Sequence, residues 1–257
     1  MNYPISICIP TFKEPEYLDL TIQSAIDGQV NNNEYVITID GTYTENKWVL
    51  DKWKNKIKPV IFEQIMGQSV ATNYSVYNAS NDNVFICNDD QVFPKDWDIN
   101  LLDGYNPAVD VMTANQIEPY DSMFNQFIKH DFGRTAATFD MEMFYKFEPT
   151  FRKNKIDDSG STLPYLISKI NYLKTGGWSD FPSGHVVDWE CMLKYQLCGL
   201  KMKRNYMCNL YHFVSIGTSL PEKINEKKLK EQQGFEHFRM KWGSYPKHDP
   251  ITNLKSL

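Results

Sequence analysis

Apolar and polar residues in the amino-terminal part of the chain follow one another in blocks that predict strands alternating with helices. The segment 5–9, Ile-Ser-Ile-Cys-Ile, is apolar on both faces and predicts a buried strand that stops at Pro10. Glu14-Pro15 is a typical helix start, apolar residues then recur every three or four positions, and Gly28 ends the segment. The first unit is therefore a strand, a loop and a helix.

The same unit repeats further along the chain. Residues 35–39, 59–62 and 84–87 predict three more short strands, and residues 44–55 and 67–79 predict helices between them. Such alternation predicts an α/β fold with a mostly parallel sheet flanked by helices. Ligands of these sheets bind beyond the carboxyl ends of the strands. We therefore expect Thr11 to Glu14, Asp40 and the pair Asp89-Asp90, which each follow a predicted strand, to meet in one crevice.

The pattern is less clear in the second part of the chain. Residues 98–163 predict no definite topology, and the polar segment 157–162 is interpreted as a mobile loop. Beyond it we expect a helix over 189–198 closed by Gly199, strands over 201–207 and 210–214, and a charged carboxyl-terminal helix over about 221–242.

Charge and cysteine content narrow the classes of partner. The 257-residue chain carries a formal net charge of -5, which argues against binding to nucleic acid or to an anionic membrane. Its five cysteines are scattered without a CxxC pair, so neither a disulfide framework nor a zinc site is predicted. We find no signal peptide and no apolar run of the ~20 residues that span a bilayer. These features predict a soluble, cytoplasmic protein, with peripheral contact to a membrane left open.

Asp89 and Asp90 are the strongest candidates for chemistry. Two adjacent carboxylates at the end of a buried strand are costly unless a positive group meets them, although Asp is also common in ordinary strand-ending turns. The chain has neither a GxGxxG segment nor a Walker A lysine loop, so a phosphate ligand would need Mg²⁺ or Mn²⁺ to bridge it to these acids. Asp40-Gly41 is a common turn signal, and its functional alternative is a carboxylate that accepts a hydrogen bond from a base or ribose.

These segments together resemble a known family. In their order along the chain they are similar to the GT-A fold glycosyltransferases, above all the large inverting family two, at the following positions: Pro10-Thr11-Phe12-Lys13-Glu14, Asp40-Gly41, Gly67-x-x-x-Ala71-x-Asn73, Asp89-Asp90-Gln91, Gly176-Gly177-Trp178, Val187-Asp188-Trp189-Glu190 and Tyr211-His212. The resemblance implies one GT-A, Rossmann-like domain over 1–257. Its parts would be a nucleotide-sugar-binding half (1–97), an acceptor and catalytic half (98–219) and a terminal helix and tail (220–257).

The resemblance also assigns the donor side of a reaction. Four residues would hold the nucleotide of a sugar donor, with a UDP-sugar favoured: Thr11, Glu14, Asp40 and Asp89. Asp90 would ligate Mn²⁺ or Mg²⁺. His212 would be a late metal ligand or would contact phosphate, although a lone histidine between two aromatic residues is more often a packed or surface residue.

On the acceptor side, the resemblance makes Asp188 the catalytic base that deprotonates a hydroxyl of a glycan, a lipid-linked sugar or a protein. Because Asp188 directly precedes a predicted helix, it is equally typical of an N-cap. Trp178 would be a wall of the acceptor site or a core tryptophan, and Gly177 would allow close backbone approach or form a turn. Glu190 would be a secondary acceptor contact.

Departures from the family pattern limit these expectations. Ile39, Lys13 and Ser75 replace residues that are frequent in the family, which leaves the nucleotide base open. The Gln-x-x-Arg-Trp signature of processive synthases is absent, so a single-transfer, hexosyltransferase-type enzyme is expected. One rival is a sugar-phosphate nucleotidyltransferase, whose Gly-rich first loop this chain lacks. The other is a non-catalytic module that binds carbohydrate or nucleotide sugar.

Overall fold

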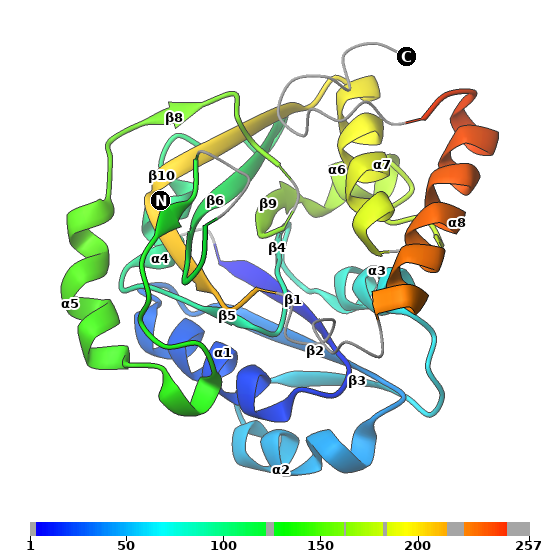
Figure 1. Ribbon diagram of the computed structural model, residues 1–257. Coiled ribbons are helices and arrows are strands. Elements are labelled where there is room, and N and C mark those ends of the chain that lie inside the picture. The colour runs from blue at the N-terminus through cyan, green and yellow to red at the C-terminus, as the bar shows by residue number, and fades with distance from the viewer. Residues whose placement is uncertain (1–3, 122–125, 162, 182–183, 215–223, 246–257) are drawn as a thin grey trace.

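The computed structural model describes residues 4–121, 126–161, 163–181, 184–214 and 224–245. Within these residues, ten strands form a single sheet with the order β3-β2-β1-β4-β9-β6-β10-β5, in which β7 lies beside β6 and β8 beside β10 (Figure 1). No helix in these ranges combines the length and the apolar character needed to cross a membrane.

The amino-terminal part folds as the alternating pattern predicts. Its elements are β1 (Ile5–Thr11), α1 (Pro15–Gly28), β2 (Glu34–Asp40), α2 (Tyr43–Trp53), β3 (Lys58–Phe62), α3 (Gln68–Asn78) and β4 (Asn83–Ile86). β1 pairs in parallel with both β2 and β4, and β2 pairs in parallel with β3. The predicted parallel α/β unit is therefore present.

Pro10 does not end the first strand as predicted, because β1 continues through Thr11. The Cys8 carbonyl accepts a hydrogen bond from the Cys87 amide at 3.2 Å, at the end of the ladder between β1 and β4. Every second residue of a strand faces the same neighbour, so Pro10 faces the side on which this ladder has already ended. The N–H that proline lacks would have no strand partner there.

Gly28 ends α1 for a different reason from the predicted one. A β-carbon at this position would lie 2.3 Å from the carbonyl oxygen of Pro94, and the Asp96 amide donates to the Gly28 carbonyl at 2.7 Å. The close approach of the loop after β5, rather than a left-handed cap, requires glycine here.

The second part of the chain completes the sheet. Its elements are β5 (Gln91–Val92), α4 (Trp97–Leu102), β6 (Asp110–Glu118), β7 (Ile128–Lys129), α5 (Met141–Phe151), β8 (Ile156–Asp157), β9 (Tyr165–Ser168), α6 (Lys169–Lys174), α7 (Gly184–Leu197), β10 (Lys201–His212) and α8 (Ile224–Trp242). β9 runs antiparallel to β4 and β6, β5 runs antiparallel to β10, and β6 pairs in parallel with β10. The sheet is thus mostly parallel at one side and mixed at the other.

Two sequence predictions in this part are wrong. The two strands predicted over 201–207 and 210–214 are one strand, because a bulge between Asn205 and Asn209 lets β10 stay paired with β6. The segment predicted as a mobile loop is held in place over its described residues: the Gly160 amide donates to the Met202 carbonyl, and buried Arg204 donates to the Ser159 carbonyl at 3.1 Å. Residue 162 and the predicted start of the last helix at 221 lie outside the described residues.

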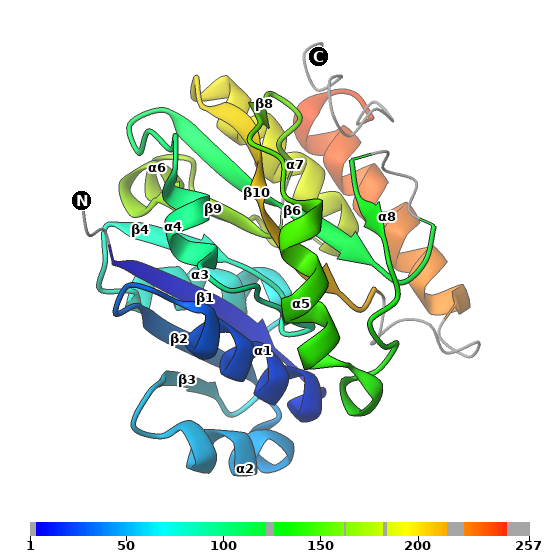
Figure 2. The same cartoon turned by 90° about the vertical axis from the view of Figure 1, so that its left-hand side faces the viewer.

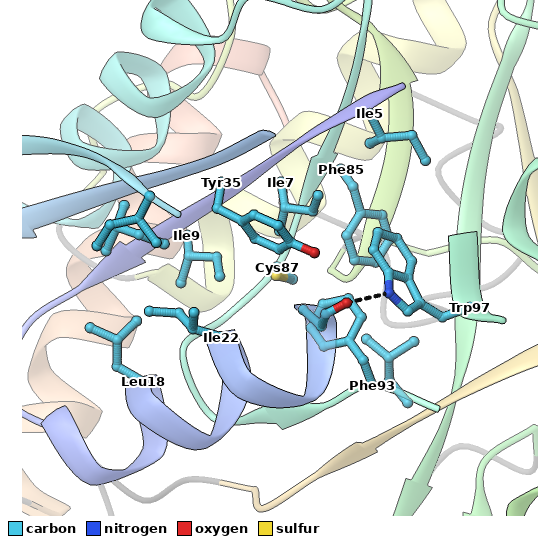
Figure 3. Packing of buried hydrophobic residues seen from close by; sticks show 14 of the residues in the cluster. Ile5, Ile7, Ile9, Leu18, Ile22, Tyr35, Phe85, Cys87, Phe93 and Trp97 are labelled. Carbon is cyan, nitrogen blue, oxygen red and sulfur yellow. Dashed lines mark hydrogen bonds between the residues drawn. The ribbon is translucent and has the colours of Figure 1, made fainter. Parts of the chain in front are cut away.

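Helices cover both faces of the sheet. Viewed from the side, α1, α4 and α5 lie in front of the strands, and α3, α7 and α8 lie behind them (Figure 2). The front core packs Leu18 and Ile22 of α1 against Ile7 and Ile9 of β1, and the indole of Trp97 donates a hydrogen bond to the Ala25 carbonyl at 2.9 Å (Figure 3). Burying a large apolar side chain contributes roughly 1.5–3 kcal/mol. This packing helps to hold the strand ends, and with them the polar loops, in fixed positions.

Candidate active site

Thr11 and Asp89, which both follow predicted strands, meet at the carboxyl ends of β1 and β4. The Thr11 hydroxyl donates to Asp89 Oδ2 at 2.5 Å, and Thr21 of α1 donates to the Asp89 carbonyl at 2.8 Å. The pKa of Asp89 is raised to about 7, chiefly by removal of the carboxylate from water and then by the charge of Asp90, against the lowering effect of the Thr11 hydrogen bond. The structure therefore brings the side chains at these two strand ends into direct contact, as expected.

His212 lies beside Asp90 although the two residues are far apart in the sequence. β5 follows Asp90 directly and pairs with the end of β10, with Gln91 opposite His212. This pairing brings His212 Nε2 within 3.6 Å of Asp90 Oδ2. Asp90 Oδ1 is buried and has no hydrogen-bond partner among the described residues. The structure thus places the two candidate metal ligands together.

Glu118, which the sequence analysis did not identify, completes this group. It ends β6, is 6% exposed, and places Oε1 3.2 Å from His212 Nδ1. The pKa of His212 is raised: removal from water lowers it, but Asp90 and Glu118 raise it by more. Glu118 was missed because Asn115 and Gln116 interrupt the apolar pattern of β6, and no strand end was predicted there.

The pair formed by Asp90 and His212 fits a divalent cation that keeps other ligands. No cluster of three or more His, Cys, Asp or Glu that could hold a metal is found in the described part of the chain. Mg²⁺ and similar ions commonly take one or two protein ligands plus phosphate oxygens and water, and two neighbouring ligand atoms of such an ion are ~3 Å apart. The 3.6 Å separation and the unpartnered Asp90 Oδ1 suit this arrangement.

Asp40 lies at the end of β2 as expected, but backbone groups use both of its oxygens. Oδ1 accepts from the Met66 amide at 2.6 Å and Oδ2 from the Gly67 amide at 2.9 Å. Gly41 has a φ of 69°, as the turn interpretation requires. Asp40 therefore fixes the segment that leads into α3. Each of its oxygens keeps one lone pair with which it could accept a further hydrogen bond.

Glu14 lies in the loop between β1 and α1, directly before the helix. Its carbonyl accepts from the Tyr17 and Leu18 amides at the start of α1, and its charge contributes to the raised pKa of Asp89 after the effects of burial, Asp90 and hydrogen bonding. Its carboxylate therefore lies close enough to the Asp89 side chain to act on it electrostatically.

Asp188 is not an N-cap, because α7 begins at Gly184 and Asp188 lies within the helix. The pKa of Tyr165 in β9 is raised mainly by burial, and the charge of Asp188 raises it further. Tyr165 pairs with Ile86, the last residue of β4. Asp188 is partly buried, and its charge acts on Tyr165 of the strand next to β4, whose end leads to Asp89 and Asp90.

The Gly176-Gly177-Trp178 segment is bound to α3 by Asn73. Asn73 Oδ1 accepts from the Trp178 amide at 2.9 Å and from the Tyr172 hydroxyl at 2.6 Å, while its Nδ2 donates to the Trp178 carbonyl at 2.8 Å. Gly177 has a φ of 64°, and a β-carbon there would lie 2.5 Å from Asn73 Oδ1. Gly177 is therefore required both by its turn and by this contact.

Trp178 and Glu190 do not fit the acceptor contacts expected of them. Trp178 is 2% exposed and its indole donates to the Tyr165 hydroxyl at 3.0 Å, so the ring belongs to the core. Glu190 is fully buried between helices, where Oε1 lies 2.5 Å from Lys241 Nζ and Oε2 lies 3.7 Å from Lys194 Nζ. Because Asp188 lies inside the helix, Glu190 projects toward α8 and links it to α7.

Comparison with solved structures shows the same fold in glycosyltransferases. The crystal structure of GalNAc-T7 with UDP, GalNAc and Mn²⁺ is similar with a TM-score of 0.58 at 12% identity, covering 81% of this chain and 43% of that one. This chain therefore spans less than half the length of that protein. Residues 1–349 of TarS from S. aureus are similar with a TM-score of 0.57 at 13% identity, covering 92% of this chain and 73% of that one.

Sequence comparison gives the family. No curated protein is significantly similar to the chain in sequence. Residues 6–167 match the family described as Glycosyl transferase family 2, and this range includes Thr11, Asp89, Asp90 and Asn73. The α/β architecture, with a mostly parallel sheet flanked by helices, is that of the GT-A glycosyltransferases. The chain therefore belongs to glycosyl transferase family 2.

Proposed function

We propose that the protein transfers one sugar from a nucleotide-diphosphate sugar, with a UDP-sugar favoured, to a hydroxyl group of a glycan, a lipid-linked sugar or a protein. The observation that carries this proposal is the contact between Asp90 and His212 at the end of β4, in a chain of glycosyl transferase family 2. The related fold of GalNAc-T7, whose structure contains UDP and Mn²⁺, supports the choice of donor and ion.

Asp90 and His212 would hold the divalent cation. Bound there, Mn²⁺ or Mg²⁺ would neutralise the charge that develops on the leaving diphosphate. The imidazole nitrogen favours Mn²⁺ over Mg²⁺, because Mg²⁺ prefers oxygen ligands. Thr11 and Asp89 would bind the donor's ribose, and their direct hydrogen bond at the carboxyl ends of β1 and β4 supports this role.

Asp188 would act as the base. Its carboxylate would take the proton from the acceptor hydroxyl while that oxygen attacks the anomeric carbon of the sugar. In the same displacement, the bond from the anomeric carbon to the diphosphate oxygen breaks, which inverts the anomeric centre. The electrostatic effect of Asp188 on Tyr165 of β9, the neighbour of β4, supports this role.

A thermal-shift screen of nucleoside diphosphates and nucleotide sugars, with and without Mn²⁺ or Mg²⁺, tests the donor side. A ligand at 100 times its Kd stabilises the folded state by ~2.7 kcal/mol. At ~2–4 °C per kcal/mol for a chain of this size, the melting temperature should rise by ~5–10 °C, and only when nucleotide and metal are both present. Asp90→Asn should remove this rise. An equal rise in Asp90→Asn with and without metal contradicts the proposal.

A transfer assay tests the acceptor side. Asp188→Asn should keep the thermal shift caused by donor and metal but stop transfer, because it loses only the base. Transfer should release a nucleoside diphosphate and give a product of inverted configuration. Release of pyrophosphate from a nucleoside triphosphate would instead indicate a nucleotidyltransferase, and donor binding without turnover, unchanged by Asp188→Asn, would indicate a binding module.

A further inference from the structure

His212 lies between two carboxylates that come from different parts of the sheet. Asp90 faces its Nε2 at 3.6 Å, and Glu118 faces its Nδ1 at 3.2 Å. The positions follow from strand pairing: Tyr211 pairs with Ile117 in the parallel ladder of β10 and β6, so the next residues on these strands, His212 and Glu118, are neighbours. The orientation of the imidazole is therefore set by a residue of β6 as well as by Asp90.

The two ring nitrogens have different roles in such an arrangement. A neutral imidazole carries one proton, and the nitrogen without it is the only one that can bind a cation. When a carboxylate accepts a hydrogen bond from Nδ1–H, the lone pair is on Nε2. In this structure Nε2 is the nitrogen on the side of Asp90.

The backbone of Glu118 is held firmly in the sheet. Its carbonyl accepts from the His130 amide at 3.0 Å, and it pairs with Lys129 in the ladder between β6 and β7. The Lys129 ammonium does not neutralise Glu118, because it lies 2.7 Å from Asp121 instead. Among the described residues, His212 is the group with which Glu118 forms an ion pair.

We propose that Glu118 is a positioning residue: it holds the proton on His212 Nδ1, so that Nε2 and Asp90 together form the binding site for the divalent cation. This inference rests on the proposed function, which supplies the cation. Glu118 does not touch the cation or the donor in this proposal, and it acts only through the orientation and tautomer of His212.

Binding of Mn²⁺ to the purified full-length protein tests this role without any activity assay. Free Mn²⁺ is measured by electron paramagnetic resonance during a titration, in the presence of UDP. Loss of a carboxylate that orients a metal-binding histidine typically weakens metal affinity by ~10–100-fold, and we expect this of Glu118→Gln. The matched control is Glu148→Gln, which replaces a buried carboxylate on α5 that pairs with Arg152 and should leave Mn²⁺ affinity unchanged.

The ¹⁵N resonances of the His212 ring give a second measurement in the metal-free protein. At a pH where the ring is neutral, the wild type and Glu148→Gln should show a single tautomer with the proton on Nδ1. Glu118→Gln should show a mixture of tautomers, since an amide accepts this proton less strongly than a carboxylate.

The outcomes separate this inference from the proposed function. If Asp90→Asn and His212→Asn weaken Mn²⁺ binding but Glu118→Gln does not, the proposed metal site stands and the role of Glu118 is refuted. If Asp90→Asn and His212→Asn bind Mn²⁺ as the wild type does, the metal site is refuted together with this role. Weaker binding in all three variants, with altered His212 resonances in Glu118→Gln, supports both.

Discussion

Asn73 of α3 is expected to contribute unusually strongly to stability for a partly exposed side chain. It makes three hydrogen bonds to the segment 172–178, two through Oδ1 and one through Nδ2. Asn73→Ala removes all three partners at once. The Tyr172 hydroxyl, the Trp178 amide and the Trp178 carbonyl each lose the hydrogen bond that they make with Asn73.

The magnitude follows from the nature of these groups. A neutral hydrogen bond contributes ~1 kcal/mol net, and an unsatisfied buried group costs ~1–3 kcal/mol. Tyr172 and Trp178 are both buried, so water replaces the lost partners poorly. Asn73→Ala should therefore lower the free energy of unfolding by about 3 kcal/mol, which at ~2–4 °C per kcal/mol lowers Tm by ~6–12 °C.

Asn78→Ala on the same helix is the matched control. Asn78 makes one exposed side-chain hydrogen bond, to the Tyr74 carbonyl, and its loss should change stability by less than ~1 kcal/mol. Both variants are measured by thermal and denaturant unfolding. Equal losses of stability in Asn73→Ala and Asn78→Ala would refute the argument that the Asn73 contacts hold α3 to the Gly176–Trp178 segment.

Three further changes test other contacts in the fold. Gly28→Ala places a β-carbon against a backbone carbonyl and should lower the free energy of unfolding in urea by ~1–3 kcal/mol. Lys241→Met leaves the buried Glu190 with only the more distant Lys194 as an ion-pair partner among the described residues, so it should lower the free energy of unfolding by ~2–3 kcal/mol. Adding Glu190→Gln should recover much of this loss. The pKa of Glu34 is lowered because hydrogen bonds from serine residues outweigh the raising effect of burial. The stabilisation from these bonds is present above the ordinary pKa of Glu and is lost as pH falls through the lowered pKa, so the stability difference between Ser6→Ala and wild type should narrow at acid pH.

Prediction from sequence succeeded where local patterns were sufficient. In the first part of the chain, apolar runs separated by Gly, Pro and Asp identified every strand and helix up to β4 to within a few residues. Thr11, Asp40 and Asp89 were expected at strand ends and lie there, because a parallel α/β unit places all its carboxyl ends on one edge.

It failed where long-range contacts decide the conformation. Nothing near residue 188 in the sequence shows that α7 begins at Gly184, so an N-cap was left open as the alternative to the catalytic role of Asp188. The polar segment around Ser159 looked mobile, but buried Arg204 holds it. Trp178 looked equally suited to an acceptor wall, and only its packing assigns it to the core.

By itself, the sequence determined the fold class, the family and the identity of the residues at the ends of β1, β2 and β4, since these depend on short-range periodicity and on the order of motifs. Only the tertiary structure decided that Asp90, His212 and Glu118 form one group. Their contact depends on β10 pairing with β5 on one side and β6 on the other, and the partners of a strand are chosen by packing across the whole sheet rather than by its own residues.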